Sequence, residues 1–319
     1  MISPRLLLPA FFLMSSLGAL ALADEAKIKP VGTATVYKTV AGRELHAYVL
    51  NPPDWKSSDH RPAIVFFHGG GWEIGHGAPT QFNAQGEYFS SRGAVCVQIE
   101  YRLIASNREE APLAACQDAK SAIRWVRSHA ADLGVDPERI VASGGSAGGQ
   151  LAAFVGMVEG TDDPADDPKV SSRPAATVMF NPALLQPSAA DSKNLPPELI
   201  ERYASISPYL HVSKDDAPGL ILVGSRDPVL PGAVLQSFQE RCRAAGLKME
   251  AVVYPGEGHG FFGLKRSADR FFETTVEMDK FLGSLGVLQG APTLTREQVQ
   301  QLAARIPLNP KSKSKSPQS

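Results

Sequence analysis

A serine among glycines is the residue of this 319-residue chain best placed for nucleophilic chemistry. Ser146 lies in Gly144-Gly145-Ser146-Ala147-Gly148, which fits the pattern G-x-S-x-G. The apolar run 140–142 before it suits a buried strand, and the apolar segment 150–153 suits a helix. A serine on such a sharp strand-to-helix turn is strained, tolerates only small neighbours and exposes its hydroxyl. The pattern therefore favours a nucleophile over an ordinary Gly-Ser loop.

A second glycine-rich segment, His68-Gly69-Gly70-Gly71-Trp72, follows the apolar run 63–67 directly. Consecutive glycines are costly to order, at about 1 kcal/mol each relative to alanine in regular structure. A merely flexible loop therefore fits poorly after a core strand. Because glycines let backbone N–H groups approach a ligand closely, the segment is typical of a loop that binds a substrate oxyanion.

One acid and one histidine follow two later apolar runs. Asp227 lies in the loop 224–231 after the run 219–223, and His259 lies in the loop 255–262 after the run 250–254. Both positions are strand ends, where open α/β sheets place their ligands.

Strand-like and helix-like patterns alternate along most of the chain. Strands are expected at residues 33–39, 45–50, 63–67, 95–100, 140–142, 176–180, 219–223 and 250–254, and helices at 82–91, 113–132, 233–245 and 267–285. This order predicts an α/β fold with a mostly parallel central sheet and helices on both faces. Residues 181–218, rich in proline and with one helical piece at 197–205, interrupt the alternation and are expected to form a small lid.

Together these motifs resemble the α/β-hydrolase fold. Within it they are similar to the esterases that carry an HGGG motif, the hormone-sensitive-lipase-like and feruloyl-esterase-like groups. The resemblance covers roughly residues 31–285. Two departures favour the feruloyl-esterase-like side. Gly145 stands where the hormone-sensitive-lipase-like group usually has an acidic residue, and residues 24–50 leave no room for the larger N-terminal cap of that group.

The resemblance implies a catalytic role for three side chains. Ser146 would be the nucleophile, His259 the general base and then the general acid, and Asp227 the partner that fixes the imidazole tautomer. The chain order Ser, Asp, His is the one that this fold uses, and the stretch from Asp227 to His259 has room for the helix and strand that the fold requires.

Backbone N–H groups would complete the site. The resemblance assigns an oxyanion hole to those of Gly70, Gly71 and Ala147. The residues that would support the two motifs are His68, Gly69, Gly144 and Gly148. Trp72 and Phe262 flank the expected pocket, and for each of them contact with an acyl group and packing in the core are equal alternatives.

Bulk composition excludes several other functions. Lys and Arg total 32 against 33 Asp and Glu, so the chain has no basic surplus for nucleic acid. The sequence contains no C-x-x-C or H-E-x-x-H pattern, and neither a metal nor a cofactor is expected. Cys96, Cys116 and Cys242 are too few and scattered for a disulfide framework and are expected to be buried thiols, although the sequence leaves open whether two of them pair.

The other histidines and one arginine are expected to be structural. His46, His60, His76, His129 and His211 have no serine or acid pattern nearby and suit surface or packing positions. Arg226 either perturbs the ionisation of its neighbour Asp227 or faces solvent, and we favour solvent.

The N-terminus is typical of a secretory signal. Arg5, the apolar run 6–17 and Ala21-Leu22-Ala23 predict cleavage after residue 23, and an uncleaved membrane anchor is the alternative. The mature protein would be secreted or periplasmic, away from the membrane. Residues 24–286 would form the hydrolase domain, and 287–319 an extension with a short helix at 295–304 and a disordered basic tail.

These expectations combine into a serine carboxylesterase for short acyl or aryl esters of small molecules or carbohydrates. The lid segment has few long apolar side chains, whereas a long acyl chain needs an apolar groove worth about 0.8 kcal/mol per methylene. Alternatives are an amide hydrolase of the same fold, arylformamidase-like or peptidase-like, and a non-catalytic binding protein on a hydrolase scaffold. The oligomeric state is left open.

Overall fold

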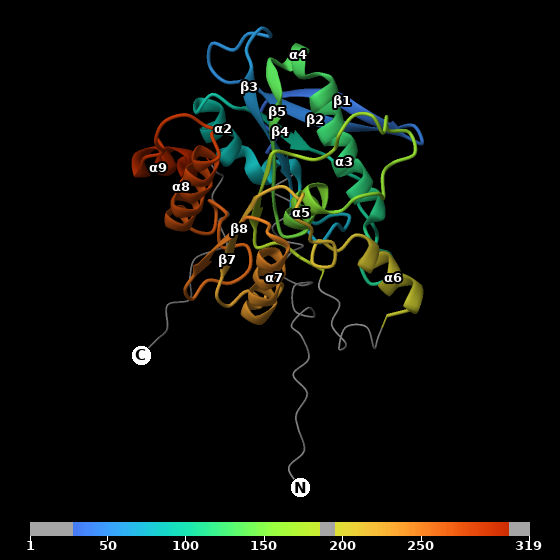
Figure 1. Cartoon of the computed structure of the whole chain (residues 1–319). Coiled ribbons are helices and arrows are strands. Elements are labelled where there is room, and N and C mark those ends of the chain that lie inside the picture. Colours follow the sequence, from blue (N-terminus) through green and yellow to red (C-terminus); the bar gives the residue numbers. More distant parts are fainter. Residues whose placement is uncertain (1–27, 186–194, 306–319) are drawn as a thin grey trace, which may run out of the picture.

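The computed structural model describes residues 28–185 and 195–305 (Figure 1). The expected signal sequence, part of the lid segment and the basic tail fall on residues 1–27, 186–194 and 306–319, outside the described residues. Within the described ranges, no helix combines the length and the apolar character of a membrane span.

A twisted sheet of eight strands in the described part of the chain forms the centre of the molecule. The strands are β1 (Thr33–Val40), β2 (Arg43–Leu50), β3 (Arg61–Phe67), β4 (Val95–Ile99), β5 (Val135–Gly145), β6 (Ala176–Phe180), β7 (Gly219–Gly224) and β8 (Met249–Tyr254). Their spatial order is β1-β2-β4-β3-β5-β6-β7-β8. β2 pairs antiparallel with β1 and β4, and the other pairs are parallel. The expected mostly parallel α/β sheet is thus confirmed, and β1 and β2 form a hairpin at one side of it.

Helices cover both faces of this sheet (Figure 1). They are α2 (Asn83–Ser91), α3 (Leu113–Ser128), α4 (Ala130–Leu133), α5 (Ala147–Met157), α6 (Pro197–Ser205), α7 (Gly232–Ala245), α8 (Ala268–Ser284) and α9 (Arg296–Ala304), with a 3-10 turn η1 (Pro79–Phe82) before α2. Because successive strand residues point to opposite faces, Val65 packs in a core with α3, α5 and α7, whereas its neighbours Ile64 and Phe66 pack with α2, α8 and α9. The sheet is therefore buried on both sides.

Two expected element boundaries were wrong. Residues 113–132 were expected to form one helix, but the helix breaks at His129, whose φ of −102° and ψ of 17° leave the helical range, and α4 follows. β5 continues beyond residues 140–142 to Gly145, because Gly144 and Gly145 still pair with Met179 and Phe180 of β6. The nucleophile motif therefore begins inside the central strand.

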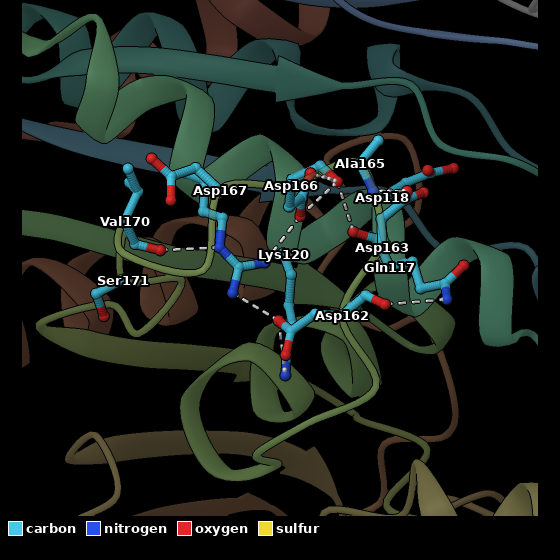
Figure 2. Close-up of polar contacts among 12 residues, drawn as sticks. Gln117, Asp118, Lys120, Asp162, Asp163, Ala165, Asp166, Asp167, Val170 and Ser171 are labelled. Carbon is cyan, nitrogen blue, oxygen red and sulfur yellow. Dashed lines mark hydrogen bonds and ion pairs between the residues drawn. The ribbon is translucent and has the colours of Figure 1, made fainter.

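Ion pairs fasten the connection between α5 and β6 to helix α3 (Figure 2). Arg124 Nη2 lies 2.6 Å from Asp162 Oδ1, and its Nη1 lies 2.8 Å from Asp166 Oδ2. The Arg124 Nε–H also donates to Val170 O at 2.8 Å. Because a buried guanidinium needs such partners to offset its desolvation, these contacts fix the path of the chain between α5 and β6.

Three smaller expectations concern the cysteines, Arg226 and the helix near the C-terminus. All three cysteines are buried and free, and burial raises the pKa of Cys116 and of Cys242 to about 12. Arg226 is exposed, as expected. The helix expected at 295–304 is present, and Thr295 and Gln298 form its capping box.

Candidate active site

Ser146 occupies a strained turn between β5 and α5. Its φ is 56° and its ψ is −116°, a conformation that few side chains adopt. The Ser146 N–H donates to Phe180 O at 2.9 Å, which holds the turn against β6. A Cβ at Gly148 would lie 2.0 Å from Phe67 O, and one at Gly144 would lie 2.2 Å from Gly148 O. Only glycine fits at these two motif positions, since backbone atoms fill the space.

Three side chains from separate loops form one hydrogen-bonded line. Ser146 Oγ lies 2.8 Å from His259 Nε2, and His259 Nδ1 lies 2.9 Å from Asp227 Oδ2. Asp227 follows β7 and His259 follows β8, so the parallel strands deliver all three residues to the same edge of the sheet. The structure thus brings together the serine, histidine and acid that the sequence singled out.

His259 is partly exposed to solvent, whereas Asp227 is buried and held by backbone hydrogen bonds. The Asp227 side chain is fully buried, whereas that of His259 is 19% exposed. Asp227 Oδ1 accepts N–H bonds from Val229 at 2.8 Å and Leu230 at 3.2 Å. With a proton on Nδ1 facing this carboxylate, Nε2 keeps a lone pair toward Ser146.

The HGGG loop packs against the serine turn. A Cβ at Gly69 would lie 2.9 Å from Gly145 O and 3.3 Å from the Ser146 Cβ. Gly70 has a φ of +115°, and a Cβ there would lie 1.5 Å from His76 O. The Gly69 N–H donates to Gln81 Oε1 at 2.6 Å, which fixes the loop from the other side. The loop backbone can therefore approach Ser146 only because these residues are glycines.

Ala147 completes the group of expected oxyanion donors. It directly follows Ser146 in the sequence, is the first residue of α5 and is buried. N–H groups in the first turn of a helix have no partner within the helix. Gly71, with a φ of +64°, lies in the loop that packs beside this turn.

His68 lies beneath the glycine loop. Its ring stacks on Tyr101 with centroids 4.3 Å apart, and the Tyr101 hydroxyl donates to His68 O at 2.6 Å. His68 Nδ1 lies 2.7 Å from Gly69 O. Burial lowers the pKa of His68 to about 4, although the contact with Gly69 O opposes this. A neutral, buried imidazole at this place is suited to support the loop.

This burial predicts a pH-dependent stability. The unfolded chain protonates His68 below about pH 6.5, whereas the folded chain does so only near pH 4, because burial lowers the pKa. The contribution of neutral His68 to the free energy of unfolding is complete above about pH 6.5 and is lost toward about pH 4, by up to about 3 kcal/mol. Urea titrations across this range should show a smaller acid loss for His68→Gln than for the wild type. Equal losses of unfolding free energy in the wild type and in His68→Gln would contradict this prediction.

For Trp72 and Phe262 the structure favours core packing over contact with an acyl group. Trp72 is 5% exposed and its Nε1–H donates to Gln150 Oε1 at 3.2 Å. Phe262 is 1% exposed and packs on Phe180 with ring centroids 4.7 Å apart. A Cβ at Gly145 would lie 2.6 Å from Phe262 Cζ, so an acidic side chain has no room there.

Two polar residues of the site were missed by sequence reasoning. Gln150 links the loop to the lid segment, since its Nε2–H donates to Ile206 O at 3.0 Å. Asn181 directly follows β6 and contacts His259. The signal for Asn181 was its place at a strand end, the same signal that identified Asp227.

The other histidines lie where packing or surface roles were expected. His46 Nδ1 of β2 lies 3.0 Å from Glu100 Oε2, directly after β4, and the exposed His76 lies 3.3 Å from Glu73. His129 and His211 contact the backbone carbonyls of Trp125 and Ala204. Across residues 28–185 and 195–305, no group of three potential ligand side chains could hold a metal ion.

This chain matches two known families and is similar to curated ester hydrolases. Residues 50–180 match the BD-FAE family, and residues 171–279 match the Dienelactone hydrolase family. The probable carboxylic ester hydrolase LipM of Mycobacterium tuberculosis is 26% identical over 78% of this chain and 60% of its own length. Esterase LipC of the same organism is 30% identical over 63% of this chain and 53% of its own length. This chain thus spans little more than half of these curated relatives.

Solved structures match over nearly their whole length. Esterase 2 of Thermogutta terrifontis, phosphonylated by cyclosarin, is 40% identical with a TM-score of 0.75, over 82% of this chain and 97% of that chain. The butyrate-bound form of the same esterase gives 40% identity and a TM-score of 0.74 over the same shares. With this coverage, and with the two glycine motifs adjoining in the fold, the chain belongs to the α/β-hydrolase-fold serine esterases that carry an HGGG motif, the feruloyl-esterase-like and hormone-sensitive-lipase-like group.

Proposed function

We propose that this protein hydrolyses carboxylic esters through an acyl-enzyme formed on Ser146. The main support is the continuous line from Ser146 Oγ through His259 to Asp227, with contacts of 2.8 and 2.9 Å. The names of the relatives, carboxylic ester hydrolase and esterase, agree with this chemistry.

In the first half of the reaction, Ser146 attacks the ester carbonyl carbon. His259 Nε2 accepts the hydroxyl proton as the new C–O bond forms. The negative charge moves to the carbonyl oxygen, which the N–H groups of Gly70, Gly71 and Ala147 stabilise. His259 then gives its proton to the leaving alcohol as the old C–O bond breaks, and the acyl group stays on Ser146.

In the second half, water takes the place of the alcohol. His259 accepts a proton from the water as its oxygen attacks the acyl carbon. The same N–H groups stabilise the second oxyanion. Collapse of this intermediate returns the proton to Ser146 and releases the carboxylic acid. Asp227 keeps the Nδ1 proton in place throughout and stabilises the imidazolium when it forms.

For the substrate we propose short acyl or aryl groups on a small alcohol or a carbohydrate. Three apolar residues of the lid segment support this, because Leu184, Leu199 and Ile206 are each at most 5% exposed and pack into the core. These three side chains therefore do not line a groove for a long acyl chain. Propionate and butyrate are bound in structures of the Thermogutta esterase.

Chain length is the sharpest test of this substrate proposal. We expect kcat/KM to be highest for p-nitrophenyl acetate or butyrate and to fall for octanoate and palmitate. Each methylene that finds no apolar surface forfeits about 0.8 kcal/mol of transfer free energy. The four esters should be assayed at one pH below their micellar concentrations, with Ser146→Ala as the background. A rate that rises steadily toward palmitate would identify a lipase instead.

We further propose that the protein is exported, with residues 1–23 as a cleaved signal, residues 24–286 as the hydrolase domain and residues 181–218 as its lid. The apolar run 6–17 and the small residues before residue 24 support the signal. Export would expose the enzyme to esterified polysaccharides and their fragments.

A further inference from the structure

Asn181 lies at the carboxyl end of β6, next to the nucleophile. It is completely buried, and its φ of 39° is in the left-handed region, which asparagine tolerates better than most residues. The backbone is fixed on both sides of this point. The Asn181 N–H donates to Leu222 O of β7 at 2.7 Å, and Phe180 O accepts the Ser146 N–H at 2.9 Å. The side chain therefore projects from a rigid support beside Ser146.

The Asn181 amide lies between the backbone of Gly260 and the ring of His259. The Gly260 N–H donates to Asn181 Oδ1 at 3.3 Å. Because a backbone N–H can only donate, it fixes the oxygen on that side and leaves Nδ2 on the other. Nδ2 lies 3.5 Å from His259 Nε2, the nitrogen that also lies 2.8 Å from Ser146 Oγ. A group that can only donate thus faces the nitrogen that needs a lone pair.

We propose that Asn181 is a positioning residue that holds the His259 loop through Gly260 and keeps Nε2 unprotonated until Ser146 transfers its proton. An amide N–H is attracted by the lone pair of a neutral imidazole and repelled by the N–H of an imidazolium. The amide therefore favours the form of His259 that acts as a base. This inference rests on the proposed function, because it assigns His259 that role.

The charged groups around the ring do not offer the same contact. They are Asp227 at Nδ1, Glu257 paired with Arg270 at 2.9 Å, the exposed Arg226, and Arg266, whose Nη1 would lie 4.0 Å from a Cβ at Gly260. In the part of the chain that the structure describes, the side-chain contacts to Nε2 come from Ser146 and Asn181. Asn181 is therefore the residue whose replacement can change the charge at Nε2 and leave the triad intact.

Two substitutions separate positioning from mere support of the fold. Asn181→Asp keeps an oxygen for Gly260 but turns a carboxylate oxygen toward Nε2, which favours the imidazolium. We expect the acid limb of its kcat/KM profile on p-nitrophenyl butyrate to move to higher pH by about one unit or more, with activity recovering at alkaline pH. Asn181→Gly suits a positive φ and removes both contacts, so it remains testable even where a buried aspartate prevents folding.

For Asn181→Gly we expect kcat to fall about tenfold with a smaller change in KM, since the completely buried side chain acts through His259 and Gly260. The acid limb of its kcat/KM profile should also move to higher pH, but by less than that of Asn181→Asp. Asn51→Asp is the control, because it makes the same change of side chain at an exposed asparagine. Asn51 follows β2 near the start of β4, at the opposite end of the parallel strands from the site. Its profile should coincide with that of the wild type.

Two results would overturn the inference. One is a loss of activity in both Asn181 variants that is equal at every pH, which would mean that Asn181 only supports the fold. The other is wild-type kcat in a folded Asn181→Gly. Failure of the proposed function is seen separately and earlier, as a wild-type protein without esterase activity or a Ser146→Ala variant that keeps it.

Discussion

Ser146→Ala is expected to lower kcat by about a million-fold, the largest effect of any single substitution in this chain. The variant lacks the oxygen that lies 2.8 Å from His259 Nε2, so no acyl-enzyme can form. Substrate binding and the proposed oxyanion N–H groups would remain, so a small rate above that of water is expected to survive. Initial rates on p-nitrophenyl butyrate measure the loss.

Covalent labelling tests the same residue without a substrate. An organophosphate should add one group to the wild-type protein, seen by intact-mass spectrometry, and none to Ser146→Ala. The Thermogutta esterase has been solved in forms phosphorylated by paraoxon and phosphonylated by sarin. Ser143→Ala is a suitable control, since Ser143 is buried in β5, the strand that precedes Ser146, and its hydroxyl has no partner within the described structure. A full adduct or an undiminished rate in Ser146→Ala would mean that another residue is the nucleophile.

The sequence predicted the parts of this site that depend on local pattern. Ser146 was identified because a strand, small residues and a helix must follow one another to make the turn, and all three are visible in the sequence. Asp227 and His259 were identified because each follows an apolar run long enough to be a buried strand. Parallel pairing of β5, β6, β7 and β8 then brings the strand ends to one edge.

The parts that depend on packing between distant segments were not predictable. Phe262 lies in a glycine-rich loop, and nothing in its neighbours shows that its ring reaches under Gly145. Asn181 has no motif, and its contacts with His259 and Gly260 arise only after β6 and β8 are placed around β7. The break at His129 depends on local dihedral angles within a continuous helical pattern. Periodicity alone could not reveal these features.

Three strained backbone positions lie where the chemistry is proposed. Seven described residues other than glycine have a positive φ, and three of them, Trp72, Ser146 and Asn181, with φ values of 62°, 56° and 39°, belong to the site. Each adjoins the point where the HGGG loop, the serine turn and the end of β6 meet. Such conformations cost of order 1–3 kcal/mol each and persist only when surrounding contacts hold them. The hydrogen bonds of Ser146 and Asn181 to β6 and β7 are contacts of this kind.

Asp227→Asn is expected to lower kcat by about 10,000-fold and to leave KM nearly unchanged, because Asp227 contacts His259 rather than the substrate. Oδ1 of residue 227 accepts the Val229 and Leu230 N–H groups, so the asparagine must keep its oxygen there. Its NH2 then takes the place of Oδ2, 2.9 Å from His259 Nδ1, while Oδ1, 3.0 Å from Nδ1, already accepts two backbone N–H bonds. A donor in place of Oδ2 favours the tautomer in which Nδ1 accepts and the proton lies on Nε2, where it blocks transfer from Ser146.

The tautomer of His259 distinguishes two variants that lose the same charge. Asp227→Ala removes the carboxylate but imposes no tautomer, so it should retain at least as much activity as Asp227→Asn. Asp216→Asn is the matched control, because Asp216 is equally buried but lies before β7, at the end of the strand opposite Asp227, where it accepts bonds from Ser213. It should keep full activity in a protein whose thermal unfolding is checked beside the others. If the activity of Asp227→Asn were within a few-fold of the wild type, a different acid would have to orient His259. If Asp227→Ala were much less active than Asp227→Asn, loss of charge and not the wrong tautomer would explain the effect.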